Sequence, residues 1–422
     1  MITLISSTLS STLSSTLSSA SASARMAARR ALRMAALPAL AWLLTACTTP
    51  YRPPQFVEPN PRFPGLIDLA AKADGASADV LLVHGICTQD ASWAERVVAQ
   101  LAQAIADATL PPQAPPPAPT PAALAVDPQI HIVPSTLDSP AGRLRLNALI
   151  WSPLTVPLKR QLCYDQTDKS AICAGEPPYP FIRARINARI KDVLVDDCLP
   201  DALIYQGVAR DEIQRRMRAA IMQVLALSDA PPELPLMIIS ESLGSKILFD
   251  TLLRMTREDA GSPTAQMAMR AVDRLRFLVM AANQIPLLAL ADQPLSLASA
   301  GAGAGAAAAA GGNQFREAVP VPPDSLQLLL QGRLARQNRS LIDRSLTLVA
   351  LSDPNDVLSY TLPAERYSSA NVTVYNFLVS NAPTYLGLLE RPDHAHLNYL
   401  TNPDVGRLVA CGLPSSGLCK QE

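Results

Sequence analysis

The chain has 422 residues, of which 49% are hydrophobic and 17% are charged, so it can bury a sizeable core in one large domain or two smaller ones. Lys plus Arg and Asp plus Glu both number 36, which gives a net charge of zero. Proteins that bind nucleic acid normally carry a basic excess on one face, so a nucleic-acid partner is not expected.

The N-terminal 47 residues have the composition of a targeting signal. Residues 5–19 repeat Ser-Ser-Thr-Leu units without any packing pattern. Next come Arg29, Arg30 and Arg33, and then the apolar segment Met34–Leu44, which is too short to cross a bilayer as a mature helix. This order predicts a secretory signal peptide. Translation starts at Met1 or at Met26, and the second start places the arginines directly after the initiator.

The signal ends in Leu-Thr-Ala-Cys, which resembles the lipobox of bacterial lipoproteins. The resemblance implies that Cys47 is lipidated and becomes the N-terminus of the mature protein, held stably in the membrane by its acyl chains. Because Thr48 and not Asp follows the cysteine, it also implies the outer membrane of the cell envelope, facing the periplasm. Residues 48–78 would form a tether, and residues 79–422 would form the folded domain.

Six cysteines lie beyond Cys47, and an even number in an oxidising compartment favours disulfides. A metal site is not expected, since no C-x-x-C or C-x-x-H spacing occurs. Two pairs close short loops that contain turn-forming residues, and a third pair would follow by elimination: Cys163 with Cys173, Cys411 with Cys419, and then Cys87 with Cys198. The connectivity stays open at this point.

The folded domain begins with a short apolar run, Asp79–Val83, that predicts a buried parallel strand. The sequence His84-Gly85-Ile86 follows directly, and Asp90 is a suitable N-cap for the helical pattern after it. A strand, a His-Gly pair and a helix in this order resemble the oxyanion loop of α/β-hydrolases. A glycine there lets backbone amides face the reacting carbonyl.

The middle of the chain alternates inserts with further elements. Residues 110–125 are rich in Pro and Ala and predict an exposed loop. Gln129–Val133 and Arg143–Trp151 predict strands, and the irregular Cys163–Pro180 predicts a cap or lid over the site. Helical patterns follow over Phe181–Val195 and Asp211–Leu227.

The stretch Leu236–Asp250 has the sequence form of a nucleophile elbow, in which a buried strand, a sharp turn and a helix present one hydroxyl. Four apolar residues lead into Ser240-Glu241-Ser242-Leu243-Gly244. Ser242 is the candidate nucleophile. Ser240 stands where G-x-S-x-G has glycine, but it is still small and is the competitor for the role.

Later strands are predicted over Leu275–Ala281, Leu346–Leu351 and Asn371–Phe377, with a helix over Asp324–Gln337. A low-complexity Ala/Gly insert lies near residues 298–313. Because strands and helices alternate, we expect an α/β fold with a mostly parallel, doubly wound sheet and helices on both faces.

A serine nucleophile needs a base, which is itself oriented by an acid. Among the four histidines, His84 belongs to the oxyanion loop and His131 to a strand, which leaves His394 or His396. In α/β-hydrolases, which the elbow resembles, a small or apolar residue and soon an aromatic one often follow the base, and this resemblance implies His396. By the same resemblance the acid is an Asp followed by apolar residues on a turn, which implies Asp356, with Asp353 before Pro354 as the alternative.

In this order the motifs resemble the α/β-hydrolase superfamily from about Val80 to Tyr399. The resemblance implies an esterase- or lipase-like serine hydrolase that works through an acyl-serine, without cofactor or metal. The expected site is the triad Ser242, Asp356 and His396, with oxyanion donors at Leu243 and at Ile86 or Cys87. The expected substrate is a small-molecule or lipid ester. The alternative is a catalytically inactive lipoprotein that keeps the fold as a binding or scaffold module. The sequence specifies neither the ester nor the oligomeric state.

Overall fold

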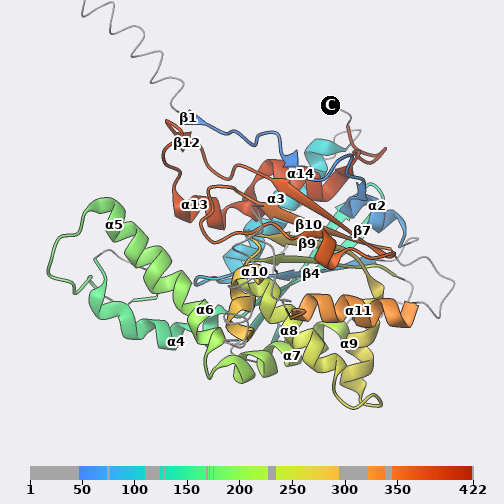
Figure 1. Cartoon of the computed structure of the whole chain (residues 1–422), viewed down its shortest axis with the longest axis horizontal. Helices are drawn as coiled ribbons and strands as arrows, with labels where there is room; N and C mark the ends of the chain where they lie inside the picture. Colours follow the sequence, from blue (N-terminus) through green and yellow to red (C-terminus); the bar gives the residue numbers. More distant parts are fainter. Residues whose placement is uncertain are drawn as a thin grey trace, which may run out of the picture. The chain divides into compact units, whose positions relative to one another are not determined.

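The computed structural model (Figure 1) describes most of the chain from Cys47 onward. The described residues are 47–73, 77–109, 124–127, 130–167, 170, 172–173, 175–226, 234–293, 322–337 and 345–420. They fall into two units. In the smaller one, described over Cys47–Pro50 and Ala382–Arg391, strand β1 (Cys47–Thr48) pairs antiparallel with β12 (Thr384–Tyr385). The other elements belong to the larger unit.

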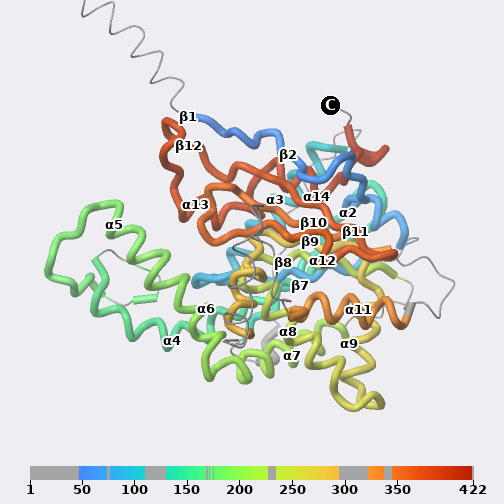
Figure 2. The backbone as a smooth tube through the Cα atoms, in the orientation of Figure 1, coloured from blue at the N-terminus to red at the C-terminus, as the bar shows by residue number. Residues whose placement is uncertain are grey.

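A nine-stranded sheet forms the centre of the larger unit, in the order β2-β11-β10-β9-β8-β4-β7-β6-β5. Figure 2 traces the backbone of this unit and labels β8, β9 and β10 among the strands. Six neighbouring strands are parallel: β11 (Val372–Leu378), β10 (Leu346–Ser352), β9 (Leu275–Ala281), β8 (Leu236–Glu241), β4 (Ser77–Val83) and β7 (Gly142–Ile150). Antiparallel strands border them: β2 (Gln55–Phe56) on one side, and β6 (Ile130–Ser139) and β5 (Leu124–Asp127) on the other. A separate pair joins β3 (Phe63–Pro64) to β13 (Gly412–Leu413).

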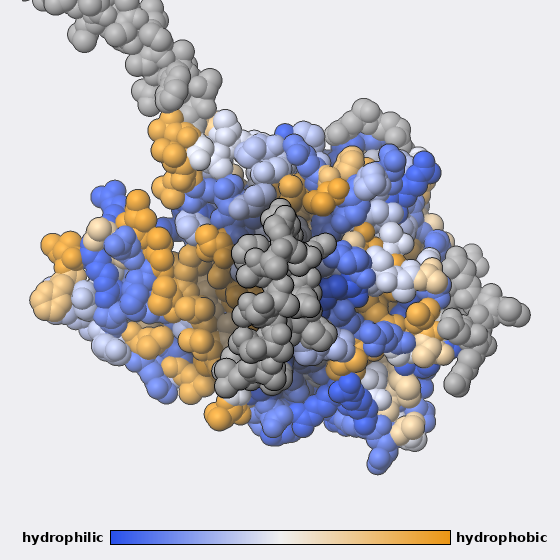
Figure 3. Space-filling view, viewed as in Figure 1, coloured by the Kyte–Doolittle hydropathy of each residue, from blue (hydrophilic) through white to orange (hydrophobic). Residues whose placement is uncertain are grey.

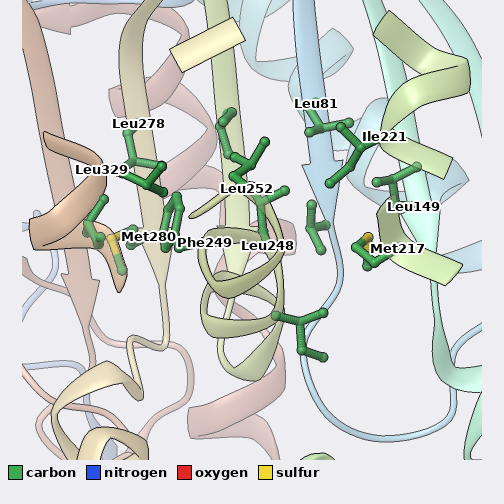
Figure 4. Packing of buried hydrophobic residues seen from close by; sticks show 14 of the residues in the cluster. Leu81, Leu149, Met217, Ile221, Leu248, Phe249, Leu252, Leu278, Met280 and Leu329 are labelled. Carbon is green, nitrogen blue, oxygen red and sulfur yellow. The ribbon is translucent and has the colours of Figure 1, made fainter. Parts of the chain in front are cut away.

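Both faces of the parallel strands are covered, which explains the mostly apolar sequences of the four central ones, β4, β8, β9 and β10. Leu81 and Val83 of β4 point into one apolar cluster, while Val80 and Leu82 point into another on the opposite face. The first cluster (Figure 4) is closed by α7 (Arg210–Ala226), α8 (Leu243–Thr256), α9 (Pro263–Arg274) and α11 (Ser325–Gln337). The second is closed by α2 (Leu66–Ala71), α3 (Ala91–Ala108) and α14 (Pro403–Cys411).

A long helical segment leads from the middle of the chain towards α7. It consists of α5 (Arg185–Arg189), the π-helix η3 (Ile190–Cys198) and α6 (Leu199–Gln206). The remaining elements are short: η1 (Ser152–Leu154), α4 (Val156–Lys159), η2 (Arg160–Asp165), α10 (Ile285–Leu288), η4 (Ala289–Asp292), α12 (Ala364–Tyr367), α13 (Pro392–Leu397) and η7 (Tyr399–Thr401). None of the helices in the described ranges is both long and apolar enough to cross a membrane.

The predicted fold class is confirmed at the level of an α/β protein with a mostly parallel sheet and helices on both faces. The strand predicted at Gln129–Val133 is longer, since β6 runs to Ser139. The helix predicted from Phe181 begins only at Arg185 and continues beyond Val195. Residues 298–313 lie outside the described residues, and so does the predicted loop 110–125 except for Leu124 and Ala125, which belong to β5.

The structure differs from the tether expected over residues 48–78. Beyond Pro50 this segment contributes β2, β3 and α2 to the larger unit. Leu66, Ile67 and Leu69 of α2 are buried in the second apolar cluster. Burial of their side chains removes apolar surface from water and stabilises the helix, although the residues before it are rich in proline, which is typical of a free chain.

The three disulfides pair as expected: Cys87–Cys198, Cys163–Cys173 and Cys411–Cys419. Cys47 is free and exposed. The pair obtained by elimination joins residues that are 111 positions apart, and it connects the loop after β4 to the end of η3.

Candidate active site

Ser242 lies on a strained turn between β8 and α8. Its backbone angles are φ 51° and ψ −131°, which a non-glycine residue adopts at a cost of about 1–3 kcal/mol and which occurs mainly at functional sites. The amide of Ser242 donates to Ala281 O at 2.8 Å, and Leu243 begins α8. The predicted strand, turn and helix are therefore present around this serine.

The loop after β4 is packed directly against this turn. A Cβ atom added to Gly244 would lie 2.1 Å from the carbonyl oxygen of His84. A Cβ atom added to Gly85 would lie 2.7 Å from the Cβ atom of Ser242. Only glycine fits at either position, because the two backbones would otherwise be pushed apart.

Ser242, His396 and Asp356 form a continuous hydrogen-bonded chain. Ser242 Oγ lies 3.1 Å from His396 Nε2, and His396 Nδ1 lies 2.9 Å from each carboxylate oxygen of Asp356. Because a carboxylate only accepts, Nδ1 carries the proton, and Nε2 is left to accept from the serine hydroxyl. The three side chains come from the β8–α8 turn, the loop after β10 and α13, and all three are buried.

The alternative residues lie elsewhere. Asp353 accepts from the backbone amides of Asn355 at 2.9 Å and Asn381 at 2.7 Å, so it holds the turn after β10. The His394 side chain is 39% exposed, with its Nε2 atom 3.9 Å from a carboxylate oxygen of Asp393. Asp356 and His396 are thus the residues whose side chains form the hydrogen-bonded chain that ends at Ser242, while the Asp353 amide meets this chain through the Tyr399 hydroxyl.

Ser240 is fully buried under the turn. Its hydroxyl accepts from Ser245 Oγ at 2.9 Å and donates to Val279 O at 3.4 Å. These bonds tie β8 to α8 and to β9. Ser240 therefore fills the position of the usual glycine as a structural hydroxyl, while the hydroxyl that meets His396 belongs to Ser242.

The expected oxyanion donors flank Ser242. Leu243 is the first residue of α8, where backbone N–H groups have no partner within the helix. Ile86 and Cys87 belong to the loop that Gly85 packs against Ser242, and Cys87 has a positive φ of 75°. The amides of the loop and of the helix N-terminus thus come from two segments that meet at the nucleophile.

His84 holds this loop in place. Its Nε2 atom accepts from the amides of Trp151 at 2.8 Å and Ser152 at 3.1 Å, and its ring stacks on the Trp151 indole at 5.1 Å. Burial, with a smaller effect of the Lys159 charge, lowers the pKa of His84 to about 3. The ring is therefore neutral at physiological pH and anchors the loop to the end of β7.

Two further groups at the site were not predicted from the sequence as parts of it. Glu241 is 4% exposed and lies beside Trp93 and Gly85, its buried Oε1 atom has no hydrogen-bond partner among the described residues, and burial raises its pKa to about 7. The hydroxyl of Tyr399 donates to Asp356 at 3.0 Å and accepts from the Asp353 amide at 2.6 Å. In the sequence, only the position of Glu241 between the two serines pointed to a role at the site. A buried acidic residue is unfavourable without a partner, so its presence in a buried strand suggests a function.

Across the described ranges, no three or more His, Cys, Asp or Glu side chains are grouped so that they could hold a metal ion. No protein-family model matches this sequence, and no curated protein is significantly similar to it. The case for a function therefore depends on the geometry of the site and on the sequence motifs that form it.

Proposed function

We propose that the protein is a serine hydrolase of the α/β-hydrolase type that cleaves carboxylic esters through an acyl-Ser242 intermediate. The hydrogen-bonded chain from Ser242 through His396 to Asp356, on a strained strand–turn–helix, is the observation that carries this proposal. A nucleophile, a base and an orienting acid in mutual contact are what acyl transfer to water requires.

In the proposed reaction, Ser242 Oγ attacks the ester carbonyl while its proton passes to His396 Nε2. Asp356 keeps the ring oriented and stabilises the imidazolium. The amides of Leu243 and of Ile86 or Cys87 stabilise the negative charge on the carbonyl oxygen. His396 returns the proton to the departing alcohol, and a water molecule then hydrolyses the acyl-serine by the same steps.

The segment beside the site favours an ester with an apolar part. Leu199 follows the disulfide that joins η3 to the loop after β4, and it is 42% exposed. On the same helical segment, Ile186 and Leu203 are 60% and 65% exposed. Figure 3 shows apolar surface in this region. Apolar side chains left in water next to a catalytic site are typical of a site for an apolar ligand.

A fluorophosphonate probe, which reacts only with an activated serine, tests the catalytic proposal. Wild type and Ser240→Ala should be labelled, and Ser242→Ala should not. Ser240→Ala is the matched control because it removes a neighbouring hydroxyl that does not touch His396. A folded wild-type protein that takes no label would instead favour the alternative of a non-catalytic binding or scaffold lipoprotein.

We also propose that the protein is anchored in the cell envelope through Cys47. Its thiol is exposed and free, while the other six cysteines are paired as in proteins of an oxidising compartment. Metabolic labelling with a fatty acid should mark the wild type and not Cys47→Ser. Equal labelling of both would contradict the anchor, whatever the result for Ser242.

A further inference from the structure

The loop that carries the proposed oxyanion donors is tied to η3 and η1 by three consecutive residues. Cys87 forms the disulfide with Cys198. Thr88 donates to the Asp197 carboxylate from its amide at 3.1 and 3.2 Å and from its hydroxyl at 2.6 Å. Gln89 exchanges two hydrogen bonds with Ser152 Oγ, at 3.0 and 2.7 Å.

The end of η3, to which this loop is attached, is itself held in place by Lys159. Lys159 is fully buried, and its Nζ atom lies 2.8 Å from the Asp197 carboxylate and 3.1 Å from that of Asp201. It also donates to Asp197 O at 3.0 Å. A buried ammonium that lost these partners would be left uncompensated, which is strongly unfavourable, so the end of η3 is a firm point of attachment.

The same helical segment also reaches the element that carries the proposed base. Arg189, at the end of α5, pairs with Asp393 at 3.0 Å. Asp393 lies in α13, three residues before His396. One continuous segment, α5–η3, is thus bonded both to the loop that packs against Ser242 and to the helix that carries His396.

The backbone of Cys87 explains why such an attachment is needed. Its φ of 75° is unfavourable for a residue with a side chain, by about 1–3 kcal/mol, and persists only where the surroundings impose it. A released loop could relax to an ordinary conformation and turn its amides away from the reacting carbonyl. The bonds of Cys87 and Thr88 to η3 prevent this.

We infer that the Cys87–Cys198 disulfide and Asp197 are positioning groups that hold the oxyanion amides of Ile86 and Cys87 in place. The inference rests on the proposed hydrolase function. Because oxyanion donors act on the transition state, loss of their alignment lowers kcat and leaves KM nearly unchanged.

The test compares double variants of two disulfides in hydrolysis of a soluble p-nitrophenyl ester. Cys87→Ala/Cys198→Ala should lower kcat about 100-fold, the lower end of the effect of losing one oxyanion donor, with KM within about threefold. Cys411→Ala/Cys419→Ala is the matched control, since that bond lies in the C-terminal segment, and its kcat should stay within about threefold of wild type. Both variants are checked for folding by near-UV circular dichroism.

Asp197→Asn covers the case in which the first double variant does not fold. It keeps the disulfide and the side-chain shape but weakens the three bonds from Thr88. It also removes one of the two carboxylate charges beside Lys159, while Asp201 keeps the other. We expect kcat to fall about 10-fold at an unchanged KM. The inference is overturned if a folded Cys87→Ala/Cys198→Ala protein, or Asp197→Asn, keeps the wild-type kcat, or if the control loses as much. If wild type neither hydrolyses esters nor takes the fluorophosphonate label, the proposed function fails, and the inference fails with it.

Discussion

The stability advantage of Glu241→Gln over wild type should grow as the pH rises, because wild type loses stability and the variant does not. Glu241 is 4% exposed, and burial raises its pKa from 4.5 to about 7. The folded state therefore binds a proton between pH 4.5 and 7 that the unfolded state releases, and the free energy of unfolding falls as the pH rises through this window. At roughly 1.4 kcal/mol per pKa unit, the loss amounts to about 3 kcal/mol by pH 8.

Glu241→Gln keeps the shape of the protonated acid and cannot ionise, so it avoids this loss. We expect the variant and wild type to unfold at similar urea concentrations at pH 4, and the variant to be about 3 kcal/mol more stable at pH 8. The groups around Glu241 are His396, Asp356, Trp93 and the backbone of Gly85, and they are the same in both proteins.

Glu95→Gln serves as the control, because it removes an exposed carboxylate from α3, the helix that also carries Trp93. The stability difference between Glu95→Gln and wild type should be much smaller at pH 8. A difference between Glu241→Gln and wild type that does not change from pH 4 to pH 8, or that favours wild type at pH 8, would refute the reasoning.

Three further predictions concern the groups around the site. In Gly244→Ala, the new Cβ atom would meet the carbonyl oxygen of His84 at 2.1 Å and displace the loop, so kcat for hydrolysis of a p-nitrophenyl ester should fall at least 100-fold. The control Gly261→Ala adds its Cβ atom in open space and should keep the wild-type kcat. Tyr399→Phe removes the bond to Asp356 and should lower stability by about 1–3 kcal/mol in urea unfolding, and an unchanged midpoint would contradict this. The pKa of His84 falls from 6.5 to about 3, so stability is lost as the pH drops through this window, by about 4–5 kcal/mol in total. His84→Gln should show a weaker dependence in unfolding curves from pH 7 to 4, and an equal dependence would exclude His84 as the source.

Much of the fold could be predicted because its strands are buried on both faces. Runs such as Asp79–Val83 and Leu346–Leu351 are apolar without alternation, which is typical of parallel strands between two helical layers. The tether over residues 48–78 was the exception. There the proline-rich composition was visible, but the burial of Leu66 depends on partners distant in the sequence.

Motif order was enough to propose a site but not to choose between neighbours. His394 and His396 are two residues apart on the short helix α13, so they point in different directions, and only the packing of that helix decides which one is buried. Glu241 escaped prediction because its buried contacts, to Trp93 and to the loop at Gly85, come from segments about 150 residues earlier in the chain.

Localisation of the acyl group in a trapped intermediate tests the central claim most directly. Wild-type protein is mixed with a slowly hydrolysed p-nitrophenyl ester, quenched in acid and fragmented in a mass spectrometer that can separate Ser240 from Ser242. The proposed mechanism predicts one acyl group for each protein molecule, on Ser242, and none in Ser242→Ala. An acyl group on Ser240 or on any other residue, or hydrolysis that persists in Ser242→Ala, would contradict it.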